Sequence, residues 1–312
     1  MTTAVIDRTA AAPPGFAGGA VAVGNFDGVH RGHQALVATA ARWAVRVGGP
    51  AVAVTFDPPP FQILVPDVPT RPPLTALDDR ADLLRAAGAD RVIVYRPDRE
   101  LLGLSPESFA RDVLFGQLGA RAVVEGYDFR FGRGRAGDTA LLRGLCDAAG
   151  VGFEEVSPLT AGGEAVSSSR VRSALLAGDV AAAADLLGRP YRVTGTVVTG
   201  ARRGRTIGFP TANLADVPTV LPGNGVYAVR GFVNGVAWPG AANVGPNPTF
   251  GDDARKVEVH LIGFTGDVYG MRLPVEFVAK LRDTRPFAGP AELIDQLGRD
   301  VAAARELVEA TP

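Results

Sequence analysis

The N-terminal half of this chain is organised around residues 23–33, VGNFDGVHRGH. The apolar run Ala20 to Val23 predicts a buried strand, and helical spacing begins at Gln34 and continues to Val47. His30 and His33 therefore lie where a strand passes into a helix, a place where free backbone N–H groups and the helix dipole attract anions. Because two imidazoles three residues apart share a helical face, the pair predicts a phosphate-binding site.

Two other interpretations of this pair are weaker. Neither histidine has a Cys or an acidic partner at metal-ligand spacing, which disfavours a metal site. The pair also suits two histidines that cap an ordinary turn, but the GNFD before it favours a phosphate.

Residues 24–33, GNFDGVHRGH, resemble the signature of the nucleotidyltransferases whose HxGH holds the phosphates of ATP, in the form found in bacterial FAD synthetases. A second stretch, GFPTANL at 208–214, looks like riboflavin kinase. From about residue 20 to residue 305 the chain thus resembles bifunctional riboflavin kinase/FAD synthetases. The resemblance implies catalytic roles for His30 and His33 and ATP contacts from Gly24, Asn25, Phe26, Asp27 and Gly32.

Length and charge limit the classes of protein to consider. At 312 residues the chain is longer than most single cores, so two domains are expected. The net charge of −1 and the lack of a basic stripe argue against a nucleic-acid partner. Only Lys256 and Lys280 are lysines, and no GxxxxGK[ST] occurs, so ATP chemistry here is not of the Walker type.

The single cysteine indicates the compartment. Cys146 lies on an apolar helical face with Leu142 and Leu145, which predicts a core residue and suits a reducing cytoplasm. The sequence has no run of about 18 apolar residues and no hydrophobic signal core. We expect a soluble, cytoplasmic protein without a membrane partner, and we leave homo-oligomerisation open.

The N-terminal half alternates between strands and helices. Residues 1–18 are rich in Ala, Pro and Gly and predict a flexible leader. The strands expected after the first are 51–56, 91–95, 120–124 and 153–156. Helices are expected over 77–87 and 139–149, and a further helix is expected to begin with Ser105 as its cap and Pro106 at its first position. This alternation predicts a doubly wound, Rossmann-like α/β domain that binds its ligand at the carboxyl ends of the strands.

Two further segments of this half suit a nucleotide. Residues 126–134, GYDFRFGRG, offer rings that stack, arginines that pair with phosphate and glycines that permit close approach, although a glycine-rich surface loop explains them equally well. Ser167 to Arg172 place serine caps and arginines in a first helical turn, where an anion relieves the unfavourable charge. The resemblance favours the nucleotide in both cases and implies ATP contacts from Asp128, Ser168, Arg170 and Arg172.

A helix that stops at Gly188 marks the boundary between the two halves. Beyond it the expected strands are 191–198, 225–233, 236–244, 256–264 and 273–281, with a hairpin at Asn234-Gly235 and a final helix over 291–308. Five or six antiparallel strands predict a small closed barrel. We expect a leader over 1–18, an adenylyltransferase domain over 19–188 and a riboflavin kinase domain over 189–312.

The barrel half carries a candidate nucleotide site. Gly195, Gly200 and Gly204 lie in a segment whose amides and arginines suit a polyphosphate, although a glycine-punctuated hairpin explains it better on its own. Thr211 and Asn213 are two residues apart, so on an extended chain their oxygens point to one side and suit a hard cation. The resemblance implies that they meet magnesium-bound ATP, with all three glycines at the nucleotide.

A candidate base follows in the strand 256–261, KVEVHL. Val257 and Val259 share one face and Glu258 and His260 the other, a pattern that an ordinary barrel surface explains as well. The resemblance implies that Glu258 takes the proton from the riboflavin 5′-hydroxyl, whereas His260 is expected to be structural. Residues 243–250 also match a family segment, without a role that follows from the residues.

Two departures from the family pattern affect these expectations. Pro59 stands where the family commonly has the His of PHP, and residues 281–287, LRDTRPF, lack the Glu and Lys of the family's LRxExKF. The second departure concerns the flavin contacts that the resemblance assigns to Arg282 and Phe287.

The expected function is flavin cofactor synthesis: ATP phosphorylates riboflavin to FMN in the barrel, and the α/β domain joins FMN to the adenylyl group of a second ATP. One alternative is a transferase that acts on another substrate, such as a pantetheine phosphate, which explains HxGH but not PTAN. The other is a flavin-binding regulator without turnover.

Overall fold

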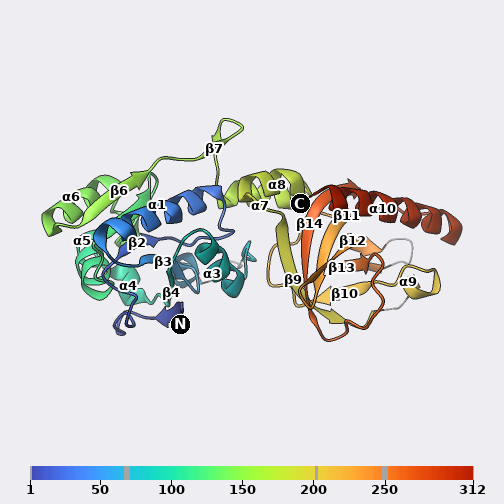
Figure 1. Ribbon diagram of the computed structural model, residues 1–312, viewed down its shortest axis with the longest axis horizontal. Coiled ribbons are helices and arrows are strands. Elements are labelled where there is room, and N and C mark those ends of the chain that lie inside the picture. The colour runs from blue at the N-terminus through green and yellow to red at the C-terminus, as the bar shows by residue number, and fades with distance from the viewer. Residues whose placement is uncertain (1, 67–70, 201–202, 248–251, 312) are drawn as a thin grey trace. The chain divides into compact units, whose positions relative to one another are not determined.

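The computed structural model describes residues 2–66, 71–200, 203–247 and 252–311 (Figure 1). Contacts divide the chain into two compact units. The first consists of Met1–Arg71 and Ala76–Val166, and the second of Pro72–Thr75 and Ser167–Pro312.

The first unit is built on a parallel sheet with the strand order β1-β4-β3-β2-β5-β6. Its strands are β1 (Thr3–Ile6), β2 (Ala20–Val23), β3 (Ala51–Phe56), β4 (Arg91–Tyr95), β5 (Ala122–Gly126) and β6 (Gly152–Val156). The order reverses between β2 and β5, which makes their carboxyl ends the topological switch point where such sheets bind ligands. The predicted doubly wound fold is confirmed, with β5 two residues later than expected.

Residue size differs between the two faces of this sheet. Ala20, Ala22, Ala51 and Ala53 face α1 (Arg31–Val47) and α3 (Leu77–Ala86), whereas the valines between them face η1 (Phe109–Gln117) and α6 (Thr139–Ala149). Because alanine side chains are short, the alternation lets α1 approach its face of the sheet closely.

Residues 3–6 differ from the expected flexible leader. They form β1, which pairs in parallel with β4, and Phe16 is 2% exposed in the core. Ala4 and Ile6 are buried and alternate with more exposed residues, as is typical of a strand at the edge of a sheet. The Ala, Pro and Gly around this short strand hide its pattern in the sequence.

The remaining elements of the first unit are short. They are α2 (Pro60–Leu64), α4 (Arg99–Gly103), α5 (Pro106–Ser108), η2 (Arg133–Arg135), β7 (Thr160–Ala161) and β8 (Glu164–Ala165). The predicted cap is confirmed, because the Ser105 side chain accepts a hydrogen bond from the Ser108 N–H.

The second unit contains a closed barrel with the strand order β10-β13-β12-β11-β14-β9, as predicted. Its strands are β9 (Tyr191–Val198), β10 (Ala212–Ala215), β11 (Gly225–Val233), β12 (Val236–Asn247), β13 (Asp252–Leu261) and β14 (Arg272–Arg282). Asn234 and Gly235 both have positive φ, 51° and 80°, as the tight hairpin between β11 and β12 requires.

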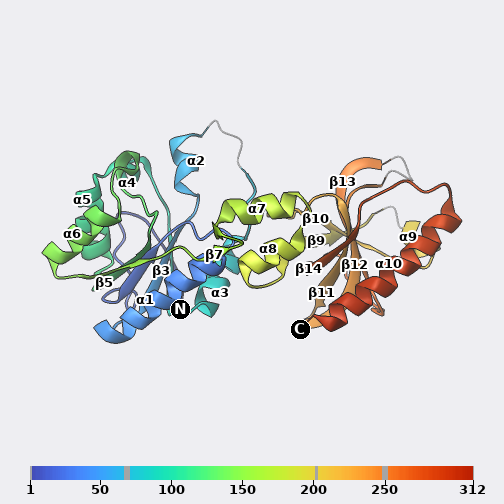
Figure 2. The same cartoon turned by 90° about the horizontal axis from the view of Figure 1, so that it is seen from above.

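Helices accompany the barrel. They are α7 (Ser168–Leu176), α8 (Val180–Leu187), α9 (Arg203–Thr206) and α10 (Pro290–Ala310). Figure 2 shows α10 along the barrel, where Ala304 and Val308 pack against Ala228 of β11. By their contacts α7 and α8 group with the barrel, so the division of the two activities at 188/189 stays a prediction.

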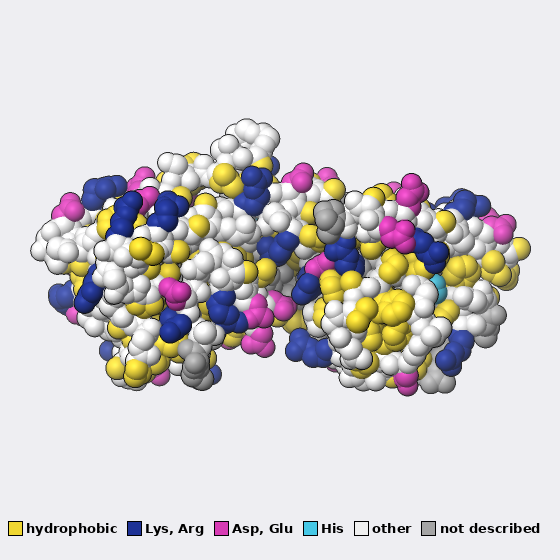
Figure 3. Space-filling view, viewed as in Figure 1, with side chains coloured by type: hydrophobic (Ala, Val, Ile, Leu, Met, Phe, Trp, Pro, Cys, Tyr) yellow, Lys and Arg dark blue, Asp and Glu magenta, His cyan; other side chains and the backbone are white. Residues whose placement is uncertain are grey.

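Charged side chains are interspersed over the surface. On the face drawn in Figure 3, lysine and arginine side chains lie among acidic and uncharged ones. Within the described residues, no helix combines the length and the apolar character that crossing a bilayer requires.

Candidate active sites

The histidine pair lies at the start of α1. The helix begins at Arg31, three residues earlier than expected, so His30 is its N-cap and His33 is in its first turn. The two rings stack with centroids 3.6 Å apart and an interplanar angle of 18°. Nδ1 of His30 accepts a hydrogen bond of 3.3 Å from the His33 N–H, so His30 caps the helix as well as facing His33.

Burial determines the protonation of this pair. His30 is 6% exposed, and Nδ1 of His33 is buried with no hydrogen-bond partner among the described residues. Burial lowers the pKa of His33 well below its ordinary value, and electrostatic interactions with His30 and with the Arg80 guanidinium lower it further. His33 is therefore uncharged at neutral pH.

Gly32 leaves room for the His30 ring. A Cβ at position 32 would lie 3.2 Å from both Cε1 and Nδ1 of His30. The glycine between the two histidines therefore permits their stacking.

The loop before the helix has a strained backbone. Phe26 and Val29 have φ of 47° and 41°, in the left-handed region that non-glycine residues rarely adopt. Both side chains are buried, and the Phe26 ring meets the His33 ring edge-on at 5.2 Å. Strain of about 1–3 kcal/mol per residue is typical of functional sites and requires support from the surrounding packing.

Glu125 is a site residue that sequence reasoning missed. It is 1% exposed, and its Oε1 accepts a hydrogen bond of 2.8 Å from the Val23 N–H, at the switch point between β2 and β5. Burial raises the pKa of Glu125 well above its ordinary value. The only signal in the sequence is one glutamate inside the apolar run of β5.

The segment 126–134 differs in part from expectation. Phe131 is 5% exposed and packs in the core, and Phe129 packs against that core and stacks on Phe131. Phe131 therefore fills the interior, whereas Phe129 is partly buried against it. Tyr127 and Asp128 are exposed where β5 ends.

The arginines of α7 lie at the N-terminal end of that helix. Ser167 is the N-cap and accepts a hydrogen bond from the Arg170 N–H, and Ser168 is the first helical residue. Arg172 donates to the Pro72 carbonyl oxygen at 2.6 Å. The role of Ser168, Arg170 and Arg172 in binding ATP stays a prediction.

The barrel aligns Asn213 with Glu258. Ala212 and Leu214 are buried, whereas Thr211 and Asn213 lie on the opposite side of the chain. Asn213 of β10 lies directly across from Glu258 of β13, and Glu258 lies directly across from Asn243 of β12. Directly opposed residues share a face, so the two amides flank the carboxylate.

A magnesium nucleotide fits this donor set. Among the described residues, no three His, Cys, Asp or Glu side chains gather into a metal cage. Hydroxyl and amide oxygens, with one carboxylate beside them, suit Mg²⁺, which takes few protein ligands and binds mainly water and phosphate.

Three glycines shape the same region. A Cβ at Gly200 would overlap the Asn213 amide, one at Gly204 would overlap the Phe209 carbonyl oxygen, and one at Gly195 would lie 2.8 Å from the Ala215 carbonyl oxygen. They therefore allow close backbone approach. Residues 201–202, between Gly200 and Gly204, lie outside the described residues, as do residues 248–250 of the family segment 243–250.

His260 positions the chain before Thr211. Its Nδ1 lies 2.8 Å from the Pro210 carbonyl oxygen, and its ring meets that of Phe209 at 5.7 Å. These contacts agree with the structural role expected for it.

Two family models cover most of the chain. The FAD synthetase model matches residues 14–170, and the riboflavin kinase model matches residues 187–308. The chain belongs to the bifunctional riboflavin kinase/FAD synthetase family. The FAD synthetase match includes strands β2 to β6 of the parallel sheet, and the riboflavin kinase match includes the barrel.

Full-length relatives agree with this assignment. The chain is 40% identical over 295 residues to the bifunctional riboflavin kinase/FMN adenylyltransferase of Pseudomonas fluorescens, covering 94% of both chains. The Bacillus subtilis protein of the same name is 36% identical, covering 90% of this chain and 89% of the relative. A solved structure named as a macrolide-efflux protein from Streptococcus pneumoniae matches with a TM-score of 0.88 and 30% identity, covering 98% and 99% of the two chains.

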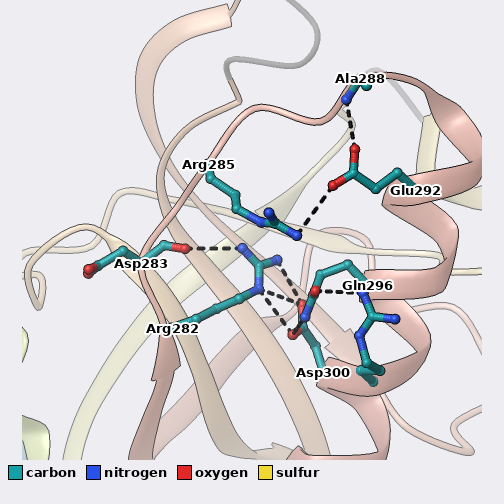
Figure 4. Close-up of polar contacts among 8 residues, drawn as sticks. Arg282, Asp283, Arg285, Ala288, Glu292, Gln296 and Asp300 are labelled. Atoms are coloured by element: carbon teal, nitrogen blue, oxygen red, sulfur yellow. Dashed lines mark hydrogen bonds and ion pairs between the residues drawn. The ribbon is translucent and has the colours of Figure 1, made fainter.

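In the riboflavin kinase domain, Arg282 is held by an ion pair with α10 (Figure 4). Its Nε and Nη2 donate to the Asp300 carboxylate at 2.8–3.1 Å, and Gln296 donates to the same carboxylate. Asp300 is 4% exposed, and a buried carboxylate requires such partners. Arg282 therefore links β14 to α10.

Phe287 lies beside the same cluster. The guanidinium groups of Arg282 and Arg285 lie 5.5 Å and 4.9 Å from its ring centre, and Arg285 pairs with Glu292 of α10. The flavin contacts expected of Arg282 and Phe287 stay predictions.

Proposed function

We propose that His30 and His33 hold the phosphates of ATP in the FAD synthetase domain. The observation that carries this proposal is the stacked pair at the N-terminus of α1, in which His30 is buried and His33 is partly buried. The first turn of α1 contains no acidic residue, so it does not repel an anion. Gly24, Asn25, Phe26, Asp27 and Gly32 form the wall of this site.

The chemistry of adenylyl transfer suits this set of residues. An oxygen of the FMN phosphate attacks the α-phosphorus of ATP, the new P–O bond forms, and the bond to the β-phosphate breaks to release pyrophosphate. The nucleophile is already an anion, so the domain requires no base. Its residues orient the phosphates and stabilise the charge, and each well-placed donor contributes about 3 kcal/mol by analogy with oxyanion holes. Asp128 is also proposed to contact ATP, and the ATP contacts of Ser168, Arg170 and Arg172 stay predictions from the motif.

Glu258 is the proposed base of the riboflavin kinase domain. It accepts the proton of the riboflavin 5′-hydroxyl as that oxygen attacks the γ-phosphorus of ATP, and ADP leaves. Thr211 and Asn213 hold the magnesium nucleotide, and Gly195, Gly200 and Gly204 let the backbone approach it. Mg²⁺ supplies positive charge that offsets the charge of the phosphates. The register that places Asn213 opposite Glu258 supports this assignment.

The remaining assignments concern the flavin and the compartment. Arg282 and Phe287 are proposed to contact the flavin of the kinase domain from the end of β14. The single, buried Cys146 supports a reducing, cytoplasmic setting. Oligomeric state and transfer of FMN between the sites are open.

Two variants test these assignments together. With riboflavin, ATP and magnesium, His33→Ala is expected to accumulate FMN without FAD, because only the second site is lost. Glu258→Ala is expected to leave riboflavin unphosphorylated yet convert supplied FMN to FAD. Chromatographic separation of the three flavins gives both rates, and the retained activity of each variant is its folding control.

Other outcomes contradict the proposal. Loss of both activities from one folded variant means that the sites are wrongly divided between the domains. Riboflavin returned unchanged by the unmodified protein supports a flavin-binding regulator instead.

A further inference from the structure

Arg80 is a buried arginine that the proposed mechanism does not use. It lies in α3, and only 5% of its surface is exposed. Arginine is almost never buried without partners that compensate for the loss of hydration. Its partners therefore indicate which part of the domain requires a fixed positive charge.

Hydrogen bonds connect Arg80 to the loop before the histidines. Its Nη1 donates to Thr55 Oγ1 at 3.2 Å and to the Phe56 carbonyl oxygen at 3.4 Å, at the carboxyl end of β3. Thr55 Oγ1 donates in turn to the Asn25 carbonyl oxygen at 3.0 Å. A chain of hydrogen bonds thus runs from α3 through β3 to the strained loop that carries Phe26.

The charge of Arg80 acts on the same site. Burial lowers its pKa, and the carboxylates of Asp27 and Asp57 oppose that effect, so the guanidinium stays charged. Besides burial, two groups lower the pKa of His33: His30, which is stacked on it, and Arg80 from α3. Arg80 is thus a permanent cation whose charge acts on a neutral imidazole.

We propose that Arg80 is a positioning residue of the adenylyltransferase site: it holds the loop at Asn25 through its hydrogen bond to Thr55, and its fixed positive charge acts on the loop and on His33. This inference rests on the proposed assignment of His30 and His33 to ATP. The reason for the arrangement is electrostatic. With Arg80 charged at every working pH, His33 stays uncharged and its ring keeps one N–H to donate to a phosphate oxygen.

The experiment compares Arg80→Met, Arg80→Lys and Arg85→Met in the full chain. Arg85 is the matched control, because it lies on the same helix but bonds to Thr3 and Asp82. Adenylyl transfer to FMN is measured against pH. The titration of the three histidines is followed by NMR of their ring Cε1–H groups, assigned with single-histidine variants.

We expect Arg80→Met to lower kcat/KM for adenylyl transfer by about 100-fold, because a loop displaced by about 1 Å misplaces the reacting groups. The pKa of His33 is expected to rise, which moves the acid limb of the pH profile upward. Arg80→Lys keeps the charge, so His33 is expected to titrate near its original pH although only part of the rate returns. Arg85→Met is expected to change neither, and all three variants are expected to retain riboflavin kinase activity.

Two results overturn the inference. One is unchanged titration of His33 in Arg80→Met, which leaves Arg80 with a purely structural role. The other is an Arg80→Met variant whose adenylyl transfer matches that of Arg85→Met. The variant His33→Ala separates failure of this inference from failure of the site assignment on which it rests. If His33→Ala still makes FAD, the ATP site lies elsewhere, independently of the results for Arg80.

Discussion

At His33 and Glu125 the protein environment favours the form that carries no charge. The pKa of His33 is lowered and that of Glu125 is raised, chiefly by burial in both cases. Each group therefore makes stability depend on pH, in opposite directions. Glu125 favours the folded state fully below about pH 4.5, its ordinary pKa, and loses this contribution as the pH rises through its higher folded value. The contribution of His33 is lost as the pH falls below about 6.5.

Glu125→Gln is expected to raise the unfolding free energy of the sheet unit at pH 8. Glutamine keeps an oxygen for the Val23 N–H and never ionises. The gain over the unmodified protein is expected to vanish near pH 4.5 and to grow by at most about 1.4 kcal/mol per pH unit above it, up to the folded pKa. His33 is present in both proteins, so its pH-dependent contribution cancels from the difference between their unfolding free energies.

Tryptophan fluorescence measures this stability. Trp43 lies in α1 and Trp238 in β12, so in a Trp238→Phe background urea unfolding reports on the sheet unit alone. Glu155, exposed and directly opposite Glu125 on β6, provides the matched control Glu155→Gln. If both substitutions change stability alike at every pH, Glu125 is not held neutral by burial.

At the scale of the element, α1 combines a structural and a chemical role at one end. The position before α1 carries no serine, threonine, aspartate or asparagine, the usual N-cap residues, and His30 serves as the cap instead. The two interpretations of the sequence, a capped turn and a phosphate site, are therefore compatible.

The two roles of His30 are separable by substitution. His30→Ala is expected to lower the unfolding free energy of the sheet unit by about 1 kcal/mol, because the cap is lost, whereas His30→Asn restores a good cap. Both variants are expected to lose adenylyl transfer, since neither has an imidazole. Urea unfolding through Trp43 and the FAD assay measure the two effects.

An Asn variant that regains activity together with stability contradicts the phosphate role of His30. Riboflavin kinase activity, which belongs to the barrel, is the control for protein concentration and folding.

At the scale of the whole molecule, two folds with separate hydrophobic cores carry separate sets of residues. The sheet unit holds its histidine pair at a switch point, and the barrel holds Asn213 and Glu258 in register on neighbouring strands. The histidine pair is proposed to act only in adenylyl transfer, and Asn213 and Glu258 only in phosphorylation of riboflavin.

Mixing His33→Ala with Glu258→Ala is therefore expected to restore FAD synthesis from riboflavin. FMN made by the first variant diffuses to the intact adenylyltransferase site of the second. The rate of FAD formation after mixing is measured by flavin chromatography, with each variant alone as the control. Accumulation of FMN without FAD in the mixture contradicts independent sites.

Local patterns predicted most of the elements, because the signals that define them are local. Strand 91–95, helix 139–149 and the hairpin at Asn234-Gly235 follow from alternation, capping and turn residues a few positions apart. The strand over residues 3–6 was not predicted, because four residues are too few for their alternation to stand out from the surrounding sequence. The rings of residues 126–134 suit a nucleotide by their sequence, and only packing revealed that Phe131 fills the core.

The sequence by itself determined the two-domain plan, the α/β and barrel folds, and the motifs at His30, His33, Thr211, Asn213 and Glu258. Only the tertiary structure decided that Arg80 reaches the carboxyl end of β3 and that Glu125 bonds to the end of β2, although they lie 50 and 95 residues from His30 along the chain. The physical reason is that a motif records neighbours along the chain, whereas the burial and charge that set a pKa depend on neighbours in space.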